Sequence, residues 1–231
     1  AEILCVGTEL LLGDIVNTNA AYLSGQLAAL GIGVYRHTAV GDNPGRLTAA
    51  LRSALDSADL VITSGGLGPT YDDLTKQTIC AAFDQPLVLH PDILEEIRVF
   101  YESALHVPMP ENNAQQAMLP RGCTVFDNPV GTAPGCAFVK DGVHVLMLPG
   151  PPFECQTMTR RCALPYLRRL SGEVIVSHDI MSFGLGESSV EELLHDQMVR
   201  MDNPTLATYA KPAEVRLRAT AKAGSREEAE T

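Results

Sequence analysis

The sequence predicts an α/β protein with a mostly parallel sheet, followed by a smaller α+β unit. Short apolar runs alternate with helical patterns over residues 3–83, as they do in a doubly wound parallel sheet. Asp141-Gly142 lies between two apolar runs, which is a strong signal for a two-residue hairpin. After Ser171-Gly172 the pattern restarts with shorter elements. These three observations set the fold class.

The first part of the chain reads as three strand–helix units. The expected strands are 3–6, 32–40 and 60–63, and the expected helices are about 18–30, 44–55 and 72–83. Residues 7–9 read as a loop, and Gly31 is placed to stop the first long helix. Asn43 and Pro44 supply an N-cap and a first-turn proline for the next helix.

The middle of the chain changes character. Two helical stretches, 91–105 and about 110–118, precede hairpin strands at 135–140 and 143–148. A helix that carries Met158 and Cys162 follows, and Pro165 is expected to bend it. The hairpin indicates an antiparallel addition to the parallel sheet.

The last part is expected to hold a strand at 174–182, a helix at about 187–201, and strands at 205–210 and 215–222. Ser225-x-x-Glu228 then opens a capped helix close to Thr231. Because so short a helix is marginal by itself, we expect the chain to be a fragment of a longer protein.

Composition limits the function classes. Seventeen Lys and Arg against twenty-eight Asp and Glu give a net charge of −11, and there is no basic run. Binding to nucleic acid or to a membrane surface through a general positive field is therefore not expected. No run of apolar residues is long enough to span a membrane and no signal peptide is visible, so we expect a cytoplasmic protein. The six cysteines form no Cys-x-x-Cys pair and are expected to be reduced.

Residues 60–76 form the most informative segment, because a strand breaks into three glycines before a helix begins. Backbone N–H groups of Gly65 to Gly68 can approach an anion, and the adjacent Asp72 and Asp73 can hold a divalent cation. The segment matches neither a P-loop nor a dinucleotide fingerprint. The alternative is a tight turn in which Asp73 completes a capping box with Thr70.

Four motifs in this order resemble the N-terminal part of the competence/damage-inducible CinA proteins. They are Gly7-Thr8-Glu9-Leu10-Leu11-Leu12-Gly13, Asn17-Thr18-Asn19, Gly65-Gly66-Leu67-Gly68-Pro69-Thr70-Tyr71-Asp72-Asp73 and Leu148-Pro149-Gly150-Pro151-Pro152-Phe153-Glu154. The resemblance covers essentially the whole chain. It implies a three-layer α/β/α molybdopterin-binding-like domain over residues 1–170 and a small α+β KH-type domain over 171–231, truncated at its C-terminus.

The resemblance further implies a metal-dependent pyrophosphatase that hydrolyses ADP-ribose to AMP and ribose 5-phosphate, acting as a homodimer with Mg²⁺ or a similar divalent metal. Many family members carry a C-terminal nicotinamide-nucleotide amidase domain, which this sequence lacks. We therefore do not expect that amidase activity here.

Two residue roles follow from matching the motifs. Asp42 and Asp73 match the site aspartates of the molybdopterin-binding fold and are expected to be catalytic, with Asp42 orienting or deprotonating water. Asp72, Asp73 and Glu9 are expected to bind metal. The expected substrate-binding set is Gly65, Gly66, Leu67, Gly68, Thr70, Asn17, Asn19 and Lys76, with Glu154 as a further candidate. Lys76 reads equally well as a solvated helix lysine, and Asn17 as an N-cap.

Two rivals remain beside the enzyme. The first is a non-catalytic module that binds a pterin or nucleotide and serves as a scaffold for the missing amidase domain. The second takes the KH-type unit as an RNA binder. Residues 183–187, Phe-Gly-Leu-Gly-Glu, lack the Gly-x-x-Gly clamp that this second rival needs, so nucleic acid is not an expected partner.

Overall fold

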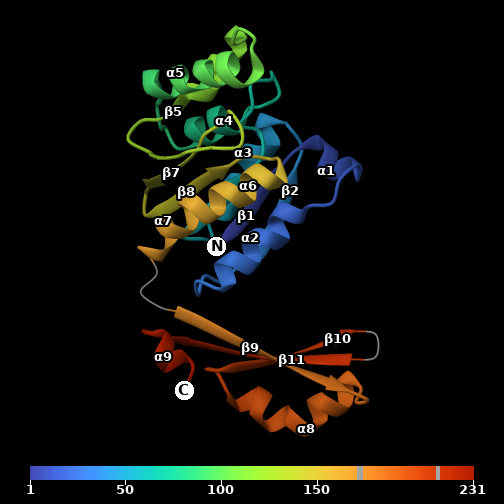
Figure 1. The fold of residues 1–231 in the computed structure, drawn as a ribbon. Coiled ribbons are helices and arrows are strands. Elements are labelled where there is room, and N and C mark those ends of the chain that lie inside the picture. Colours follow the sequence, from blue (N-terminus) through green and yellow to red (C-terminus); the bar gives the residue numbers. More distant parts are fainter. Residues whose placement is uncertain (171–173, 212–213) are drawn as a thin grey trace. The chain divides into compact units, whose positions relative to one another are not determined.

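The computed structural model describes residues 1–170, 174–211 and 214–231, and its chain divides into two compact units (Figure 1). The first unit comprises Ala1–Gly25 and Gly33–Tyr166, and the second comprises Gln26–Ile32 and Leu167–Thr231. None of the helices in the described ranges is long and apolar enough to cross a membrane.

A six-stranded sheet forms the centre of the first unit, in the order β2-β1-β3-β8-β7-β6. Its strands are β1 (Glu2–Val6), β2 (Arg36–Val40), β3 (Leu60–Ser64), β6 (Thr124–Phe126), β7 (Gly135–Lys140) and β8 (Val143–Leu148). Strands β2, β1, β3 and β8 are parallel, whereas β7 pairs antiparallel with both β8 and β6. Asp141 and Gly142 both have positive φ angles, as the predicted hairpin turn requires. A separate two-stranded ladder pairs β4 (Leu87–Leu89) with β5 (Met118–Pro120).

Helices lie on both faces of the sheet (Figure 1). They are α1 (Thr8–Leu12), α2 (Thr18–Ala28), α3 (Pro44–Leu55), α4 (Thr75–Ala82), α5 (Pro91–Phe100), α6 (Pro152–Met158) and α7 (Leu164–Arg168). Wider π-helical turns, η1 (Tyr101–Leu105) and η3 (Thr159–Ala163), and a 3₁₀ segment, η2 (Glu111–Ala117), complete the set. The predicted three-layer α/β/α class with a mostly parallel sheet is confirmed.

The core explains why these segments are strands and helices. β1 and β3 are buried along their whole length, as expected for central parallel strands. Helix α3 buries Leu47, Leu51 and Ala54 on one face, and Asn43 caps it by accepting a hydrogen bond from the Arg46 N–H at 3.0 Å.

Several predicted boundaries were wrong. The segment expected as a loop at 7–9 contains the start of α1, and the second strand begins at Arg36 instead of residue 32. Helix α4 begins at Thr75, three residues after its predicted start at Asp72. The short strands β4, β5 and β6 were not predicted, because three residues are too few to show an alternating pattern.

The second unit holds a three-stranded antiparallel sheet in the order β10-β11-β9, with helices α8 and α9. Its elements are β9 (Val174–Phe183), α8 (Glu187–Arg200), β10 (Thr205–Lys211), β11 (Glu214–Ala223) and α9 (Arg226–Ala229). Ser225 caps α9, since its Oγ accepts a hydrogen bond from the Glu228 N–H at 3.2 Å. The predicted small α+β unit is confirmed. Ser171 and Gly172, expected as its boundary, lie outside the described residues.

Candidate functional site

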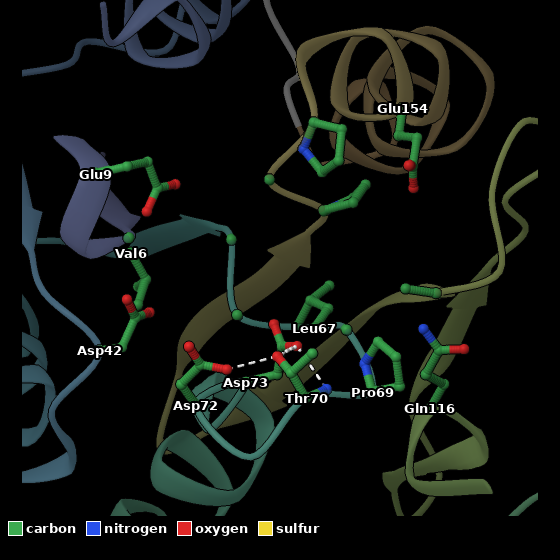
Figure 2. A pocket seen from close by; sticks show the side chains of 18 of the residues that line it. Val6, Glu9, Asp42, Leu67, Pro69, Thr70, Asp72, Asp73, Gln116 and Glu154 are labelled. Carbon is green, nitrogen blue, oxygen red and sulfur yellow. Dashed lines mark hydrogen bonds between the residues drawn. The ribbon is translucent and has the colours of Figure 1, made fainter. Parts of the chain in front are cut away.

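A pocket of about 490 Å³ opens where the parallel strands β1, β3 and β8 end. Loops at the carboxyl ends of the strands line it, which is where open α/β sheets place their ligand sites. The lining comprises residues 6, 7, 9, 15, 42, 65–70, 72, 73, 116, 132, 133, 149–152 and 154. Figure 2 shows its labelled side chains around one shared space. The strand order therefore gathers four sequence motifs at one edge of the sheet.

The glycine loop after β3 depends on the close approach of other atoms. Gly65 and Gly66 have φ angles of 108° and 68°, which disfavour residues with a side chain. A Cβ atom built on Gly65 would collide with the Val6 carbonyl oxygen, and one on Gly66 would collide with Thr75 Oγ1. On Gly68 it would collide with the carboxylate of Asp73. Gly65 and Gly66 are thus required by packing as well as by conformation, whereas Gly68 is constrained only by its contact with Asp73.

The loop turns its carbonyl groups toward neighbouring residues. Gly66 O accepts a hydrogen bond from the Thr75 N–H at 3.2 Å, and Gln115 Nε2 donates to Gly68 O at 3.0 Å. Among the residues that the structure describes, the N–H groups of Gly66, Leu67 and Gly68 have no hydrogen-bond acceptor. The N–H and C=O of a trans peptide point in opposite directions, so the bond to Gly66 O turns the Leu67 N–H away from Thr75. Consecutive unpaired N–H groups of this kind attract anions.

Asp72 and Asp73 meet at Thr70, on the floor of the pocket (Figure 2). The Thr70 N–H donates to Asp73 Oδ2 at 2.9 Å, and the Thr70 hydroxyl lies within hydrogen-bonding distance of both carboxylates. The Thr70–Asp73 pair of the predicted capping box is present, but it lies ahead of α4, whose first residue is Thr75. It closes the loop instead of capping the helix.

Asp42 and Glu9 lie on one side of the pocket (Figure 2). Asp42 Oδ2 accepts hydrogen bonds from the N–H and the hydroxyl of Thr8, both at 2.8 Å. These bonds connect the loop after β2 to the start of α1. Glu154, in the first turn of α6, lies in another part of the wall, and its Oε2 accepts a hydrogen bond from Asn128 Nδ2 at 2.7 Å. The pocket thus brings Glu9, Asp42 and Glu154 together with the aspartate pair.

Asn17 and Asn19 do not line this pocket; they border a small cavity of about 40 Å³ with Glu9. Asn17 Oδ1 accepts a hydrogen bond from the Ala20 N–H at 3.1 Å, which is an N-cap contact for α2. Asn19 is buried, and its Nδ2 donates to Ser64 Oγ at 2.8 Å and to Gly150 O at 2.7 Å. Asn19 therefore fastens the end of β3 to the loop after β8.

Lys76 does not reach the pocket, in contrast to both predictions for it. Its side chain is only 2 % exposed, and its Nζ donates to the carbonyl oxygens of Gln115 at 3.0 Å and Gln116 at 2.8 Å. Burial lowers the pKa of Lys76 to about 8, although neighbouring thiols and Asp73 oppose the shift. Because α4 begins at Thr75, Lys76 lies on the buried face of this helix, where its Nζ hydrogen-bonds to the backbone of η2.

The sequence predicted a helical stretch at about 110–118, where η2 lies, but it did not predict the contact of this segment with the glycine loop. Asn112 Nδ2 donates to Pro69 O at 3.0 Å, and Gln115 Nε2 donates to both Gly68 O and Thr70 O. Gln116, from the same segment, forms part of the pocket wall. A signal was present, because residues 111–116, Glu-Asn-Asn-Ala-Gln-Gln, contain four side-chain amides in six residues. Nothing in the sequence showed that they face the glycine loop.

The pocket is strongly acidic. Five carboxylates line it, those of Glu9, Asp42, Asp72, Asp73 and Glu154, and no Lys, Arg or His is among its described lining residues. An anionic ligand would therefore need a cation beside the loop N–H groups. In the described ranges no group of three or more His, Cys, Asp or Glu side chains is arranged to hold a metal. Paired Asp72 and Asp73 nevertheless fit Mg²⁺, which usually binds one or two carboxylates and completes its shell with ligand phosphates and water.

Known proteins match both units of the chain. Residues 2–169 match the family described as "Probable molybdopterin binding domain", and residues 177–231 match the "Damage-inducible protein CinA KH domain". Competence-damage inducible proteins from Clostridium botulinum (strain Kyoto / Type A2) and Acetivibrio thermocellus are each 50 % identical, over 229 and 228 residues. Each alignment covers 99 % of this chain but only 56 % and 55 % of the relative, so the chain spans about half the length of these proteins.

A solved structure shows the same fold. The crystal structure of the protein CinA from Thermoplasma acidophilum, described there as of unknown function, is 36 % identical with a TM-score of 0.65. The match covers 72 % of this chain and 96 % of that one.

These findings correct the expected function. The matching family is described by molybdopterin binding, and neither the names of the relatives nor that of the solved structure supports hydrolysis of ADP-ribose. The sequence alone suggested an enzyme because adjacent carboxylates beside a glycine loop suit both catalysis and metal-assisted binding. The binding-module alternative agrees better with the comparisons.

Proposed function

Because this chain belongs to the CinA family, with a molybdopterin-binding-type domain followed by a CinA KH domain, we propose that its glycine-loop pocket binds a phosphorylated pterin or nucleotide without cleaving it. One observation carries the proposal. Three consecutive N–H groups, those of Gly66, Leu67 and Gly68, lack acceptors among the described residues at a pocket whose charged lining residues are all carboxylates.

The loop supplies the first part of the anion site. Phosphate oxygens accept hydrogen bonds from successive backbone N–H groups, and the N-terminus of α4 adds a partial positive charge. Hydrogen bonds from Gln115, Asn112 and Thr75 to carbonyl oxygens of the loop hold it in this conformation. Binding would therefore require little reorganisation of the loop, which favours affinity.

A divalent cation supplies the second part. Phosphate groups next to five carboxylates would repel them unless a cation lies between the two sets of oxygens. Asp72 and Asp73 are the residues that would hold it, with the ligand's phosphates as further ligands. Cation and ligand should consequently bind together, each strengthening the other.

The module reading also accounts for the size of the relatives. They are nearly twice as long as this chain. In such proteins the two units would serve as a ligand-binding scaffold for the remaining part.

We expect Mg²⁺ to be required for ligand binding. Calorimetric titration with ADP-ribose and with 6-hydroxymethylpterin diphosphate should show binding of at least one of them in Mg²⁺. Affinity should fall at least about tenfold in EDTA, because the carboxylates then face the phosphates directly. Chromatography of the sample should recover the ligand intact. Release of AMP, or equal affinity with and without Mg²⁺, would contradict the proposal.

Asp73→Asn tests the cation site. The amide can still accept the Thr70 N–H bond, so stability should fall by no more than about 0.5–2 kcal/mol, the usual range for a lost cap-type bond. The removed charge should weaken Mg²⁺-dependent binding about tenfold or more. Asp92→Asn is the matched control, because Asp92 is exposed in the first turn of α5 and is absent from the pocket lining. Equal affinities of the two variants would argue against a metal role for Asp73.

A further inference from the structure

A second cleft, which the proposed phosphate site does not use, lies beside the glycine-loop pocket. Its volume is about 180 Å³, and it is lined by one face of α5, by β6 and by the segment 127–134 that follows β6. The same segment contributes Thr132 and Ala133 to the lining of the glycine-loop pocket, and Thr132 lines both cavities. The two cavities are therefore neighbours that share one segment of chain.

The walls of this cleft are largely apolar. Phe100 and Val125 are half-buried and Pro129 is exposed, so part of their apolar surface remains accessible. Ile93 and Ile97 of α5, which are buried, line it as well. A cavity of about 150 Å³ with such a lining is large enough to bind benzene. The cleft thus has room for one apolar group of the size of a six-membered ring.

Two carboxylates give the cleft its charge. Glu96 and Asp127 both line it and are exposed, and no Lys, Arg or His is among its described lining residues. Within the described part of the chain neither carboxylate forms an ion pair, whereas Glu95, the preceding residue of α5, pairs with Arg98. Apolar walls beside two unpaired carboxylates are complementary to a ligand that joins an apolar group to a cation.

The shared segment contacts the wall of the glycine-loop pocket directly. Asn128 lines the cleft, and its Nδ2 donates to Ala133 O at 2.9 Å and to Glu154 Oε2 at 2.7 Å. Gly131 also lines the cleft, and a Cβ atom built on it would collide with the Glu154 carboxylate. A cation in the cleft would therefore lie close to the acidic pocket and would partly offset the repulsion between its carboxylates and a phosphate.

We propose that this cleft binds a small primary ammonium compound with one ring-sized apolar group, and that its occupation strengthens binding of the phosphorylated ligand in the neighbouring pocket. The coupling between the two sites rests on the proposed function, whereas the ammonium site does not. Because coupling between two binding sites is reciprocal, the phosphorylated ligand strengthens binding of the ammonium compound by the same factor.

The ammonium site is tested on the wild-type protein with three probes, by following backbone amide signals in an NMR titration. Benzylammonium should shift the signals of α5 and of the segment 127–134, with a Kd of about 1 mM or lower. Benzyl alcohol lacks the charge and methylammonium lacks the ring, so each should bind at least about fivefold more weakly. Equal binding of benzyl alcohol, or no saturable shift at these residues, would overturn the proposal.

Variants of the two carboxylates locate the charge. The double variant Glu96→Gln, Asp127→Asn should weaken binding of benzylammonium about tenfold, and both positions are exposed, so the fold should be preserved. Glu95→Gln is the matched control, because it removes the same charge from the next residue of α5 but lies outside the cleft lining. It should change the affinity less than about twofold. Equal losses in the control and in the double variant would show that no local site exists.

Calorimetric titration with inorganic diphosphate in Mg²⁺ tests the coupling. Saturating benzylammonium should tighten diphosphate binding about threefold relative to sodium chloride at equal ionic strength. The double variant at the same benzylammonium concentration should show a smaller gain. Unchanged affinity for diphosphate while benzylammonium is bound would refute the coupling. Failure of diphosphate to bind under either condition would refute the proposed function instead, and the NMR titration would still decide the ammonium site.

Discussion

Replacing Gly65 by alanine should destabilise the first unit by at least about 3 kcal/mol and abolish ligand binding. The φ angle of 108° is strained for any residue with a side chain, at a cost of roughly 1–3 kcal/mol. The added Cβ would also collide with the backbone oxygen of Val6, which cannot move without distorting β1 at the centre of the sheet. Chemical denaturation followed by circular dichroism measures the loss.

Gly122→Ala separates the two causes. Gly122 also has a positive φ, 72°, but a Cβ there would meet nothing within 4 Å. Its replacement should cost only about 1–2 kcal/mol, the conformational part alone. If both alanine variants lose the same stability, close packing of the loop against β1 does not contribute.

Raising the pH from 7 to 9 should stabilise the wild-type protein by about 1.4 kcal/mol relative to Lys76→Met. Burial lowers the pKa of Lys76 from 10.5 to about 8 in the folded state. The unfolded chain therefore binds more protons over this range, and the free energy of unfolding rises with pH. The free-energy cost of burying protonated Lys76 is fully present below pH 8 and is relieved as the pH rises from about 8 to 10.5.

Buried thiols act in the opposite direction as the pH approaches and passes about 8.5, where unfolded cysteines ionise, but these thiols are present in both proteins. Burial raises the pKa of Cys80 to about 12 and that of Cys155 to about 11, so folded stability falls once unfolded cysteines ionise. Urea denaturation at several pH values gives the comparison. Lys140→Met, which removes a partly exposed lysine of β7, should keep the wild-type pH dependence. If the free energies of unfolding of wild type and Lys76→Met change equally with pH, burial does not lower the pKa of Lys76.

Local sequence motifs predicted much of the fold. Asn43-Pro44 predicted the start of α3, Asp141-Gly142 the β7–β8 turn, and Ser225 the cap of α9, because caps and tight turns depend on neighbours in the chain. Boundaries set by distant contacts were missed. Helix α4 begins at Thr75 because Asp73 accepts a hydrogen bond from the Thr70 N–H and the Thr75 N–H donates to Gly66 O. No sequence pattern indicates either of these hydrogen bonds.

The sequence by itself determined the fold class, the glycine loop and the adjacent Asp72 and Asp73, since a strand end, positive φ angles and neighbouring carboxylates are local properties. Only the tertiary structure decided which other residues meet them. It placed Glu9, Asp42 and Glu154 at the pocket, removed Lys76 to the interior, and brought Gln115 and Gln116 to the loop. The physical reason is that parallel strands place distant loops at one edge of a sheet, whereas the direction of each side chain depends on the packing of the whole domain.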